Sequence, residues 1–415
     1  MRGRLAAAVA VLGACLLLAG LLIPSTAPAL GAGEQGTAKE GAKPPKPPVL
    51  PARAWILIDA RDGTELAGSS ESDTVPIAST TKLMTAYLTL DRFPLGKTLT
   101  APGYSPLPAE SVLGLQKGEQ MTVRDLMTAM MLPSANDAAY ALAENVSGSI
   151  PAFVMRMNEA AGELGLDDTT YTTPVGLDDP DNGSSARDLA ELARRLMRDE
   201  RFRKIVGQTS ATLETGAIPR TVETRNTLML ADPTVNGIKT GHTLGAGYVL
   251  VASAERGGVP LISVVLGASS EAERDAESEQ LLDYGFGLYG KRTAVKRGEE
   301  LGTLPVTEGD PKSLPLEAGK PFRVVARHDQ DLEVSLEAPP AVEGPIAAGE
   351  RIGVADVLLD GEQVGKVPAL AAAGIAEESL LDKVGGPIAL LLIAGGSILL
   401  LIGLVSALRR KHAAP

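Results

Sequence analysis

The sequence contains very little cysteine, histidine or aromatic residue, and each shortage excludes a class of site. Its one cysteine, Cys15, lies in an apolar N-terminal run, so the chain can form neither an internal disulfide nor a cysteine-rich metal site. The three histidines, His242, His328 and His412, are far apart, and no H-E-x-x-H motif is present, so neither a zinc site nor a Ser-His-Asp triad is predicted. We therefore expect no metal and no cofactor.

Positive charge is also scarce, because the chain carries 39 Lys and Arg against 51 Asp and Glu, a net charge of -12. Aromatic residues make up only 3% of the 415 residues, and no basic stripe alternates with them. A nucleic-acid partner is therefore not expected. The hydrophobic content of 44% is normal for globular protein, and the length is enough for two or three domains.

The N-terminus reads as an export signal. Arg2 and Arg4 precede an apolar stretch from Leu5 to Ile23, and Ala27-Pro28-Ala29 follows as a candidate cleavage site, which gives a signal peptide over residues 1–29. The apolar stretch is long for such a signal, so a retained N-terminal anchor is the alternative. Residues 30–51 are rich in proline and glycine and predict an extended linker.

The C-terminus predicts a single transmembrane helix. Residues 387–408 carry no charge over 22 positions, which as a helix spans about 33 Å, close to the thickness of a hydrocarbon core. The basic residues of the tail, 409–415, follow at once and favour a cytoplasmic tail. We therefore expect a protein that crosses the cell membrane once through residues 387–408. A linker over residues 371–386 precedes this helix, and all residues before 387 are expected on the extracytoplasmic side.

Between these ends, residues 52–290 predict an α+β domain. Apolar runs flank Asp62-Gly63 and again Arg256-Gly257-Gly258, and both patterns are typical of antiparallel hairpins. The helical stretches between them are Thr81 to Leu90, Val123 to Met131, Asp137 to Asn145, Ala152 to Leu164, and Ala186 to Arg198. Short β-like runs such as FRVVAR and LEVSLEA then predict a small β-rich domain over residues 291–370.

The stretch PIASTTKLMT places a serine and a lysine where they can react together. In a helix, Ser79 and Lys82 are three residues apart and emerge on the same face. A serine hydroxyl needs a base beside it, and a buried lysine can be that base if it is neutral. The spacing alone is also consistent with a helix cap beside a solvent-exposed lysine, so other residues must converge on this pair.

Two later stretches do converge on it. Ser134-Ala135-Asn136 follows Pro133 in a turn before a predicted helix that Asp137 can cap. Lys239-Thr240-Gly241 enters the strand of the second hairpin, where a glycine lets backbone approach a ligand and the lysine can attract a carboxylate. The three motifs occur in this order, 55 and 105 residues apart, the set typical of penicillin-binding proteins and class A β-lactamases.

The sequence around these motifs resembles the D-alanyl-D-alanine carboxypeptidases, which are low-molecular-mass penicillin-binding proteins of the serine peptidase type. The blocks that carry the resemblance are PIASTTKLMTAYL, MLPSANDAAYALAE, MNEAAGELGLDDTTYTTPVGLD with SSARDLAELA, and NGIKTGHTLGAGYVL, and they cover about residues 53 to 270. The resemblance implies the transpeptidase fold, an antiparallel sheet with a helical cluster. It also implies penicillins as inhibitors and peptidoglycan stem peptides ending in D-Ala-D-Ala as substrates.

The resemblance further assigns catalytic roles to individual residues. Ser79 is the nucleophile, Lys82 is its base, and Ser134 carries the proton to the leaving amine. The remaining residues bind the substrate or the oxyanion, and they are Asn136, Lys239, Thr240, Gly241, His242 and Thr243. Lys239 is expected to lower the pKa of Lys82, and the oxyanion is expected between the backbone N–H groups of Ser79 and His242.

Alternatives stay open on the same fold. One is a D,D-endopeptidase, and another is a β-lactamase, for which Glu163 to Asp167 is the nearest string to a deacylation motif but reads as the end of a helix. A third, of another class, is a non-catalytic β-lactam sensor or wall-binding protein. The sequence departs from the family pattern at Thr173-Pro174, where Asn-Pro is usual, and this departure puts local loop contacts in question.

Overall fold

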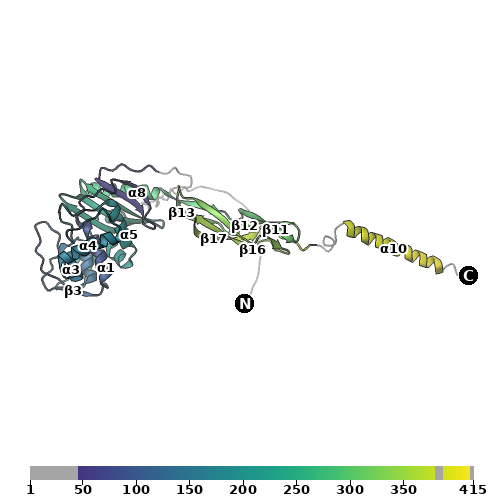
Figure 1. Cartoon of the computed structure of the whole chain (residues 1–415), viewed down its shortest axis with the longest axis horizontal. Coiled ribbons are helices and arrows are strands. Elements are labelled where there is room, and N and C mark those ends of the chain that lie inside the picture. The colour runs from purple at the N-terminus through teal and green to yellow at the C-terminus, as the bar shows by residue number, and fades with distance from the viewer. Residues whose placement is uncertain (1–44, 379–386, 412–415) are drawn as a thin grey trace, which may run out of the picture. The chain divides into compact units, whose positions relative to one another are not determined.

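The computed structural model describes residues 45–378 and 387–411, which form a peptidase domain, a β-rich domain and a C-terminal helix (Figure 1). The signal peptide predicted for residues 1–29 lies outside the described residues. So do most of the 30–51 linker, the second half of the 371–386 linker and the end of the basic tail.

A five-stranded antiparallel sheet forms the centre of the peptidase domain, in the order β2-β1-β9-β8-β7. Its strands are β1 (Ala54–Asp59), β2 (Glu65–Ser69), β7 (Val235–Thr243), β8 (Gly247–Arg256) and β9 (Val259–Ala268). The first hairpin pairs with the last through β1 and β9, so the start and the end of the domain meet in one sheet. Both predicted hairpins and the α+β class are confirmed.

The sheet is buried on both faces, and the alternation along β1 shows how. Ile56 and Ile58 point into the larger core, which the helical cluster completes. Trp55 and Leu57 point to the opposite face, which helix α8 (Glu271–Gly287) covers. Since successive side chains of a strand point to opposite faces, the continuous apolar run of β1 requires a covering layer on each side.

The helical cluster brings the reactive segments to one edge of this sheet. Its elements are η1 (Ala78–Thr81), α1 (Lys82–Arg92), α2 (Val123–Met131), α3 (Asn136–Ser147), α4 (Ile150–Leu164), α5 (Ala186–Met197), α6 (Glu200–Val206) and α7 (Leu228–Ala231). All five predicted helices are present, and α2 has the predicted bounds. Helix α4 ends at Leu164 because Gly165 takes a left-handed conformation with φ +72°, so the Glu163 string is a helix end as predicted.

Two features differ from the sequence-based expectation. The Lys239-Thr240-Gly241 motif lies on a strand of its own, β7, which pairs with β8 instead of beginning the second hairpin. Helix α8 was not predicted, because its buried positions include Arg274 and Glu277, and polar residues at buried positions obscure the hydrophobic period.

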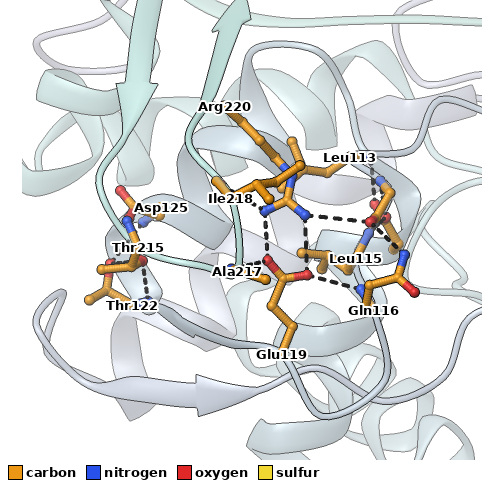
Figure 2. A network of polar contacts seen from close by, with 12 residues as sticks. Leu113, Leu115, Gln116, Glu119, Thr122, Asp125, Thr215, Ala217, Ile218 and Arg220 are labelled. Carbon is orange, nitrogen blue, oxygen red and sulfur yellow. Dashed lines mark hydrogen bonds and ion pairs between the residues drawn. The ribbon is translucent and has the colours of Figure 1, made fainter.

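A long loop, residues 101–119, leaves the short ladder of β3 (Thr98–Thr100) and β4 (Gln120–Thr122) and borders the reactive region. The C-terminal end of this loop is fixed to the hairpin of β5 (Ser210–Leu213) and β6 (Arg220–Glu223) by the network in Figure 2. There the Glu119 carboxylate accepts a hydrogen bond from the Ala217 N–H at 2.7 Å and pairs with Arg220 at 2.6 Å.

The β-rich domain contains a two-stranded ribbon and a six-stranded sheet of order β14-β16-β17-β12-β11-β15. The ribbon strands are β10 (Tyr289–Val295) and β13 (Phe322–Arg327). The sheet strands are β11 (Glu300–Glu308), β12 (Ser313–Ala318), β14 (Leu332–Glu337), β15 (Val342–Glu343), β16 (Arg351–Leu359) and β17 (Glu362–Ala371). The β structure continues past the expected boundary at 370, because Ile375 pairs with Ile346 and is buried in the core.

The C-terminal segment is a single helix, α10 (Pro387–Lys411), as the apolar run predicts. Its residues Leu390–Leu408 have a mean hydropathy of 2.5, and none of this span is buried by protein in the described chain. An apolar helix of this length that packs against no protein is suited to a lipid environment.

Candidate active site

Ser79 and Lys82 lie where η1 passes into α1. The α-helix begins at Lys82, so Ser79 lies in the preceding 3₁₀ turn and not in the same α-helix as Lys82. The Nζ atom of Lys82 is 2.9 Å from the Oγ atom of Ser79, and it also donates a hydrogen bond to the Val175 carbonyl at 3.0 Å. The pair is therefore already in hydrogen-bond contact, as a nucleophile and its base require.

Burial makes the Lys82 side chain a base near neutral pH. Its side chain is completely buried, which is the main reason that the pKa of Lys82 falls to about 7. The Glu110 carboxylate opposes this shift by stabilising the ammonium form, and the Arg225 guanidinium adds to it. A base whose pKa lies close to the working pH can both accept and return a proton.

Ser134 and Asn136 lie between α2 and α3, beside this pair. Ser134 has φ +67° and Ala78, directly before Ser79, has φ +47°, so both turns hold a non-glycine residue in the left-handed region. Such conformations cost roughly 1–3 kcal/mol each and persist only where the surrounding structure fixes them. Asn136 begins α3, and its Nδ2 donates to the Glu110 carboxylate at 2.7 Å.

Asp137 has a different role from the one expected. We expected it to cap the N-terminus of α3, but the helix begins at Asn136 without a side-chain cap. The Asp137 carboxylate instead accepts the backbone N–H groups of Leu113, Gly114 and Leu115 at 2.8 to 2.9 Å. It therefore fixes the 101–119 loop against α3, next to the residue expected to bind substrate.

Strand β7 brings the third motif against the nucleophile. A Cβ atom added to Gly241 would lie 2.9 Å from the Ser79 backbone nitrogen, so only a glycine lets the strand approach this closely. Lys239 is buried, and its Nζ donates to the Thr240 carbonyl at 2.7 Å. The exposed His242 ring stacks on Tyr248 with 4.1 Å between the ring centroids.

In addition to burial, the charge of Lys82 lowers the pKa of Lys239, but Lys239 is not among the groups that shift the pKa of Lys82. Burial, then the charges of Lys82 and Arg225, lowers the pKa of Lys239 well below its usual value. We expected Lys239 to be the cation that lowers the pKa of Lys82, but the cation with that effect is Arg225. Arg225 borders the cavity itself, whereas both lysines lie beneath its surface.

The site opens into a cavity of about 690 Å³. Among the predicted residues, its lining includes Ser79, Ser134, Asn136, Thr240, Gly241, His242 and Thr243. The lining also includes Glu110, Arg225 and Tyr248, which the sequence reasoning missed. No local motif marks these three residues, because each comes from a loop or strand position that only the folded chain brings to the cavity.

Thr243 and the loop before α5 are joined by one carboxylate. The Thr243 hydroxyl donates to Asp178, and Asp178 also accepts the Gly245 N–H at 3.1 Å. In this state the Thr243 proton is therefore engaged by Asp178 instead of pointing freely into the cavity.

The loop that contains Thr173 keeps its internal hydrogen bonds, although the family usually has an asparagine at this position. The Thr173 hydroxyl accepts the N–H groups of Val175 and Gly176 at 3.3 and 2.9 Å, which is the turn that an asparagine at this position can also form. Gly176 has φ +80°, and a Cβ there would lie 1.9 Å from the Ala78 carbonyl oxygen. The loop thus packs tightly against the turn that carries Ser79.

Comparison with known proteins identifies the family of this fold and site. The sequence model described as "D-alanyl-D-alanine carboxypeptidase" matches residues 41–270, and that of the "Penicillin-binding protein 5, C-terminal domain" matches residues 289–377. D-alanyl-D-alanine carboxypeptidase DacC of Escherichia coli is 36% identical over 81% of this chain and 87% of the relative. DacF of Bacillus subtilis is 30% identical over 86% of this chain and 92% of the relative.

A solved structure agrees with both sequence matches. Penicillin-binding protein 5 from Haemophilus influenzae superposes with a TM-score of 0.57 at 32% identity, over 80% of this chain and 99% of that one. The likeness therefore includes the β-rich domain as well as the peptidase domain. The chain belongs to the D-alanyl-D-alanine carboxypeptidase family of serine peptidases and carries the C-terminal domain of penicillin-binding protein 5.

Proposed function

We propose that this protein is a D-Ala-D-Ala carboxypeptidase that removes the terminal D-alanine from peptidoglycan stem peptides on the extracytoplasmic side of the cell membrane. The observation that carries the proposal is the contact between Lys82 and Ser79, 2.9 Å long, in a chain of this peptidase family. The amine is buried and its pKa is about 7, so a neutral base is available to the hydroxyl near neutral pH.

In the acylation step, the Ser79 Oγ attacks the carbonyl carbon between the two terminal D-alanines, and Lys82 accepts the hydroxyl proton. The backbone N–H groups of Ser79 and His242 stabilise the oxyanion that forms. Ser134 passes the proton from Lys82 to the leaving nitrogen. The C–N bond then breaks, D-alanine leaves, and the shortened peptide stays as an ester on Ser79.

Substrate binding uses the residues around the nucleophile. Asn136 binds the peptide amide of the substrate, because one N–H of its Nδ2 is held by Glu110 and a second remains for a carbonyl. Thr240 supplies a hydroxyl donor and Arg225 supplies positive charge for the terminal carboxylate, because both residues border the cavity. Lys239 lies buried beneath them and holds the Thr240 carbonyl. Thr243 joins them when its hydroxyl exchanges Asp178 for the substrate.

In the deacylation step, a water molecule attacks the ester carbonyl while Lys82, neutral again after the leaving amine took its proton, accepts a proton from the water. Lys82 returns this proton to Ser79, and the shortened stem peptide leaves. A β-lactamase needs fast deacylation as well, but its motif candidate Glu163 lies on the surface of α4, where it pairs with Arg156 at 2.9 Å. This placement favours the peptidase.

Helix α10 supports the membrane part of the proposal. Its span Leu390–Leu408 is long and apolar enough to cross a bilayer once, with the basic tail on the cytoplasmic side. The peptidase and β-rich domains precede this helix and would then face the cell wall, where the substrate is.

Acylation by benzylpenicillin tests the chemistry. The full chain in detergent is exposed briefly to the drug and analysed by intact-protein mass spectrometry, with Ser79→Ala in parallel, and release of D-alanine from a peptide ending in D-Ala-D-Ala is measured. We expect a persistent adduct on the wild type, none on the variant, and D-alanine release only from the wild type.

Each other result selects a different function. Hydrolysed drug without an adduct would indicate a β-lactamase, and intact drug without an adduct would indicate a non-catalytic wall-binding protein. Cleavage of cross-linked peptides in preference to the free terminus would indicate a D,D-endopeptidase.

A further inference from the structure

The two-stranded ribbon of the β-rich domain has a charge opposite to that of the chain as a whole. Its segments 289–298 and 319–328 contain seven Lys and Arg and no Asp or Glu, in a protein whose net charge is -12. We call these two segments the basic ribbon. Strands β10 and β13 pair antiparallel within it, so charges from both segments gather on one element.

Most of these charges are exposed and unpaired. Five side chains of the basic ribbon are exposed and form no ion pair within the part of the chain that the structure describes. They are Lys291, Lys296, Arg297, Lys320 and Arg323. The other two are engaged, because Arg292 donates to the Arg327 carbonyl at 3.1 Å and Arg327 pairs with Asp329 at 3.1 Å.

The strand register brings three of the five free charges together at one end of the ribbon. Val295 lies opposite Phe322 in the ribbon, so Lys296 and Arg297, which follow Val295, approach Lys320, which precedes Phe322. The hydrogen bond from the Gly298 N–H to the Ala318 carbonyl, 2.8 Å long, closes this end. Like charges held this close repel one another, and a bound anion would relieve that repulsion.

Two adjoining depressions line the basic ribbon. One, of about 270 Å³, is bordered by Lys291, Arg292 and His328. The other, of about 570 Å³, is bordered by Lys296 and Arg297, with one acidic residue, Glu299, at its edge. The His328 Nε2 atom is buried without a hydrogen-bond partner among the described residues, so a donor or acceptor is left for a ligand there.

We propose that the basic ribbon binds a linear polyanion of the cell wall that carries repeated phosphate groups. Arginine and lysine side chains form their strongest hydrogen bonds with anionic oxygens, and a row of exposed cations fits repeated charges better than a single anion. The ribbon is remote in sequence from the residues assigned to catalysis. Binding there would hold the peptidase within the polymer network that contains its proposed substrate.

The position of the ribbon within the β-rich domain favours a wall polymer over membrane lipid. The Phe322 ring packs at Gly365, near the start of β17, where an added Cβ would lie 2.2 Å from the ring. Strand β17 then runs to Ala371, and the chain continues through Ile375 before it leaves the domain toward α10. We call the place where it leaves the exit. Strand β11 runs between these two places: it begins at Glu300, next to the ribbon, and ends at Glu308, close to Asp310, which pairs with Ala376 at the exit. At about 3.3 Å per residue its length separates the ribbon from that exit by roughly 25 Å.

Binding of long-chain sodium polyphosphate to the full chain in detergent tests the proposal. The variant replaces Lys296, Arg297, Lys320 and Arg323 with glutamine, all exposed positions at which the fold is expected to persist. A matched control replaces four exposed basic residues elsewhere, Lys97, Lys117, Arg124 and Arg351, with glutamine. Penicillin adduct formation by each protein reports an intact peptidase domain separately from binding, so failure of the proposed catalysis and failure of the ribbon proposal remain distinguishable.

We expect the wild type and the control to bind polyphosphate alike, and the ribbon variant to bind at least roughly tenfold more weakly. At roughly 0.7 per phosphate contact, five contacts predict a slope of log K against log salt of about -3.5, and the one contact left in the variant predicts about -0.7. Equal weakening in both variants, or no binding by the wild type, would overturn the proposal. So would ribbon-dependent binding to phosphatidylglycerol vesicles with none to polyphosphate, which would assign the ribbon to lipid.

Discussion

Two side chains of opposite charge act on the Lys82 amine, which we propose as the base. Glu110 favours the ammonium form of Lys82, whereas Arg225 favours the neutral amine, and both border the same cavity. Lys239 lies buried nearby, and Arg274, also at the cavity, is already paired with Asp275 at 2.6 Å. The charge balance at Lys82 therefore depends chiefly on burial and on the two residues that no motif identified.

Neutralising these two residues should shift the pH dependence of acylation in opposite directions. Neutral Lys82 is the base, so the acylation rate rises with pH through the pKa of Lys82. Glu110→Gln removes an anion, lowers that pKa and moves the rise to lower pH, while Arg225→Gln raises that pKa and moves the rise to higher pH. We expect each shift to be roughly half a pH unit or more. Stopped-flow acylation with a fluorescent penicillin measures both.

Tyr104→Phe is the matched control for these variants. The Tyr104 hydroxyl donates to the Glu110 carboxylate, so this change removes a contact of Glu110 but not its charge. Its pH profile should keep the wild-type midpoint even if the maximal rate falls. Shifts of the same sign in both charge variants would show that Lys82 is not the group that titrates.

At the scale of residues, the sequence predicts what short motifs encode and no more. Ser79, Ser134 and Gly241 are recognisable because a nucleophile, a hydroxyl that carries a proton and a close backbone approach each require a particular residue type. Glu110 and Arg225 act through charge at a distance, which many positions could supply, so only the folded chain identifies them. This is the physical reason that the residues tuning Lys82 escaped prediction.

At the scale of elements, the loop over residues 101–119 is fixed by buried charge. Glu119 is almost fully buried and pairs with Arg220, whose side chain is 10% exposed. The same carboxylate accepts the N–H groups of Gln116 and Ala217. Because this loop carries Glu110 and its backbone accepts the Asn136 N–H at Ser111, the ion pair supports the active site indirectly.

Removing one member of this pair should destabilise the protein strongly. Arg220→Ala leaves the Glu119 carboxylate buried without its cation, and we expect a loss of about 3 kcal/mol in the free energy of unfolding. The pKa of Glu119 is lowered to about 2, chiefly by the hydrogen bonds from Arg220. Urea unfolding measures the loss. An Arg220→Ala protein as stable as the wild type would show that the pair contributes nothing.

The pH dependence of the same loss gives an internal check. A carboxyl group with a lowered pKa contributes stability above its unfolded pKa, near 4.5, and loses this stability as the pH falls toward 2. The difference between wild type and Arg220→Ala should therefore be full at neutral pH and shrink across that acidic window. The surface pair of Lys204 with Glu200 is the control, because both side chains are exposed and breaking the pair should change the stability little at any pH.

The hydrophobic period of an element decides how easily the sequence predicts it, as helices α2 and α8 show. Helix α2 has its expected bounds because its buried face is apolar apart from Asp125 and Thr128. Helix α8 buries Arg274, Glu277 and Ser278, so its period is weak although it covers a whole face of the sheet. The sequence predicts the Lys239 motif within the neighbouring hairpin and not on a strand of its own, because the tertiary fold sets which strands pair.

At the scale of the whole molecule, the chain combines a large α+β core, a smaller β-rich core and an apolar helix that the described protein does not cover. The first two bury most of their apolar side chains in clusters of their own, and Tyr289 of the ribbon joins the cluster on the α8 face of the peptidase sheet. Helix α10 buries none of its span, although leucine and isoleucine fill most of it. Such a surface is costly in water, so the helix needs a bilayer or another apolar partner.

Deleting residues 387–415 should therefore release an active protein from the membrane. Each leucine or isoleucine at the centre of a spanning helix favours insertion by about 0.3–0.6 kcal/mol, so the full helix outweighs its few polar groups. We expect the full chain to stay in the membrane fraction after an alkaline wash, and the truncated chain to be soluble with unchanged penicillin adduct formation.

The same experiment separates the two readings of the N-terminus. A truncated chain that remains in the membrane fraction would contradict anchoring by α10 and would favour a retained apolar segment over residues 5–23. The matched control deletes only the basic tail after residue 408. Because the apolar span is then intact, that protein should stay in the membrane, and its loss to the soluble fraction would show that charge, not hydrophobic length, decides anchoring.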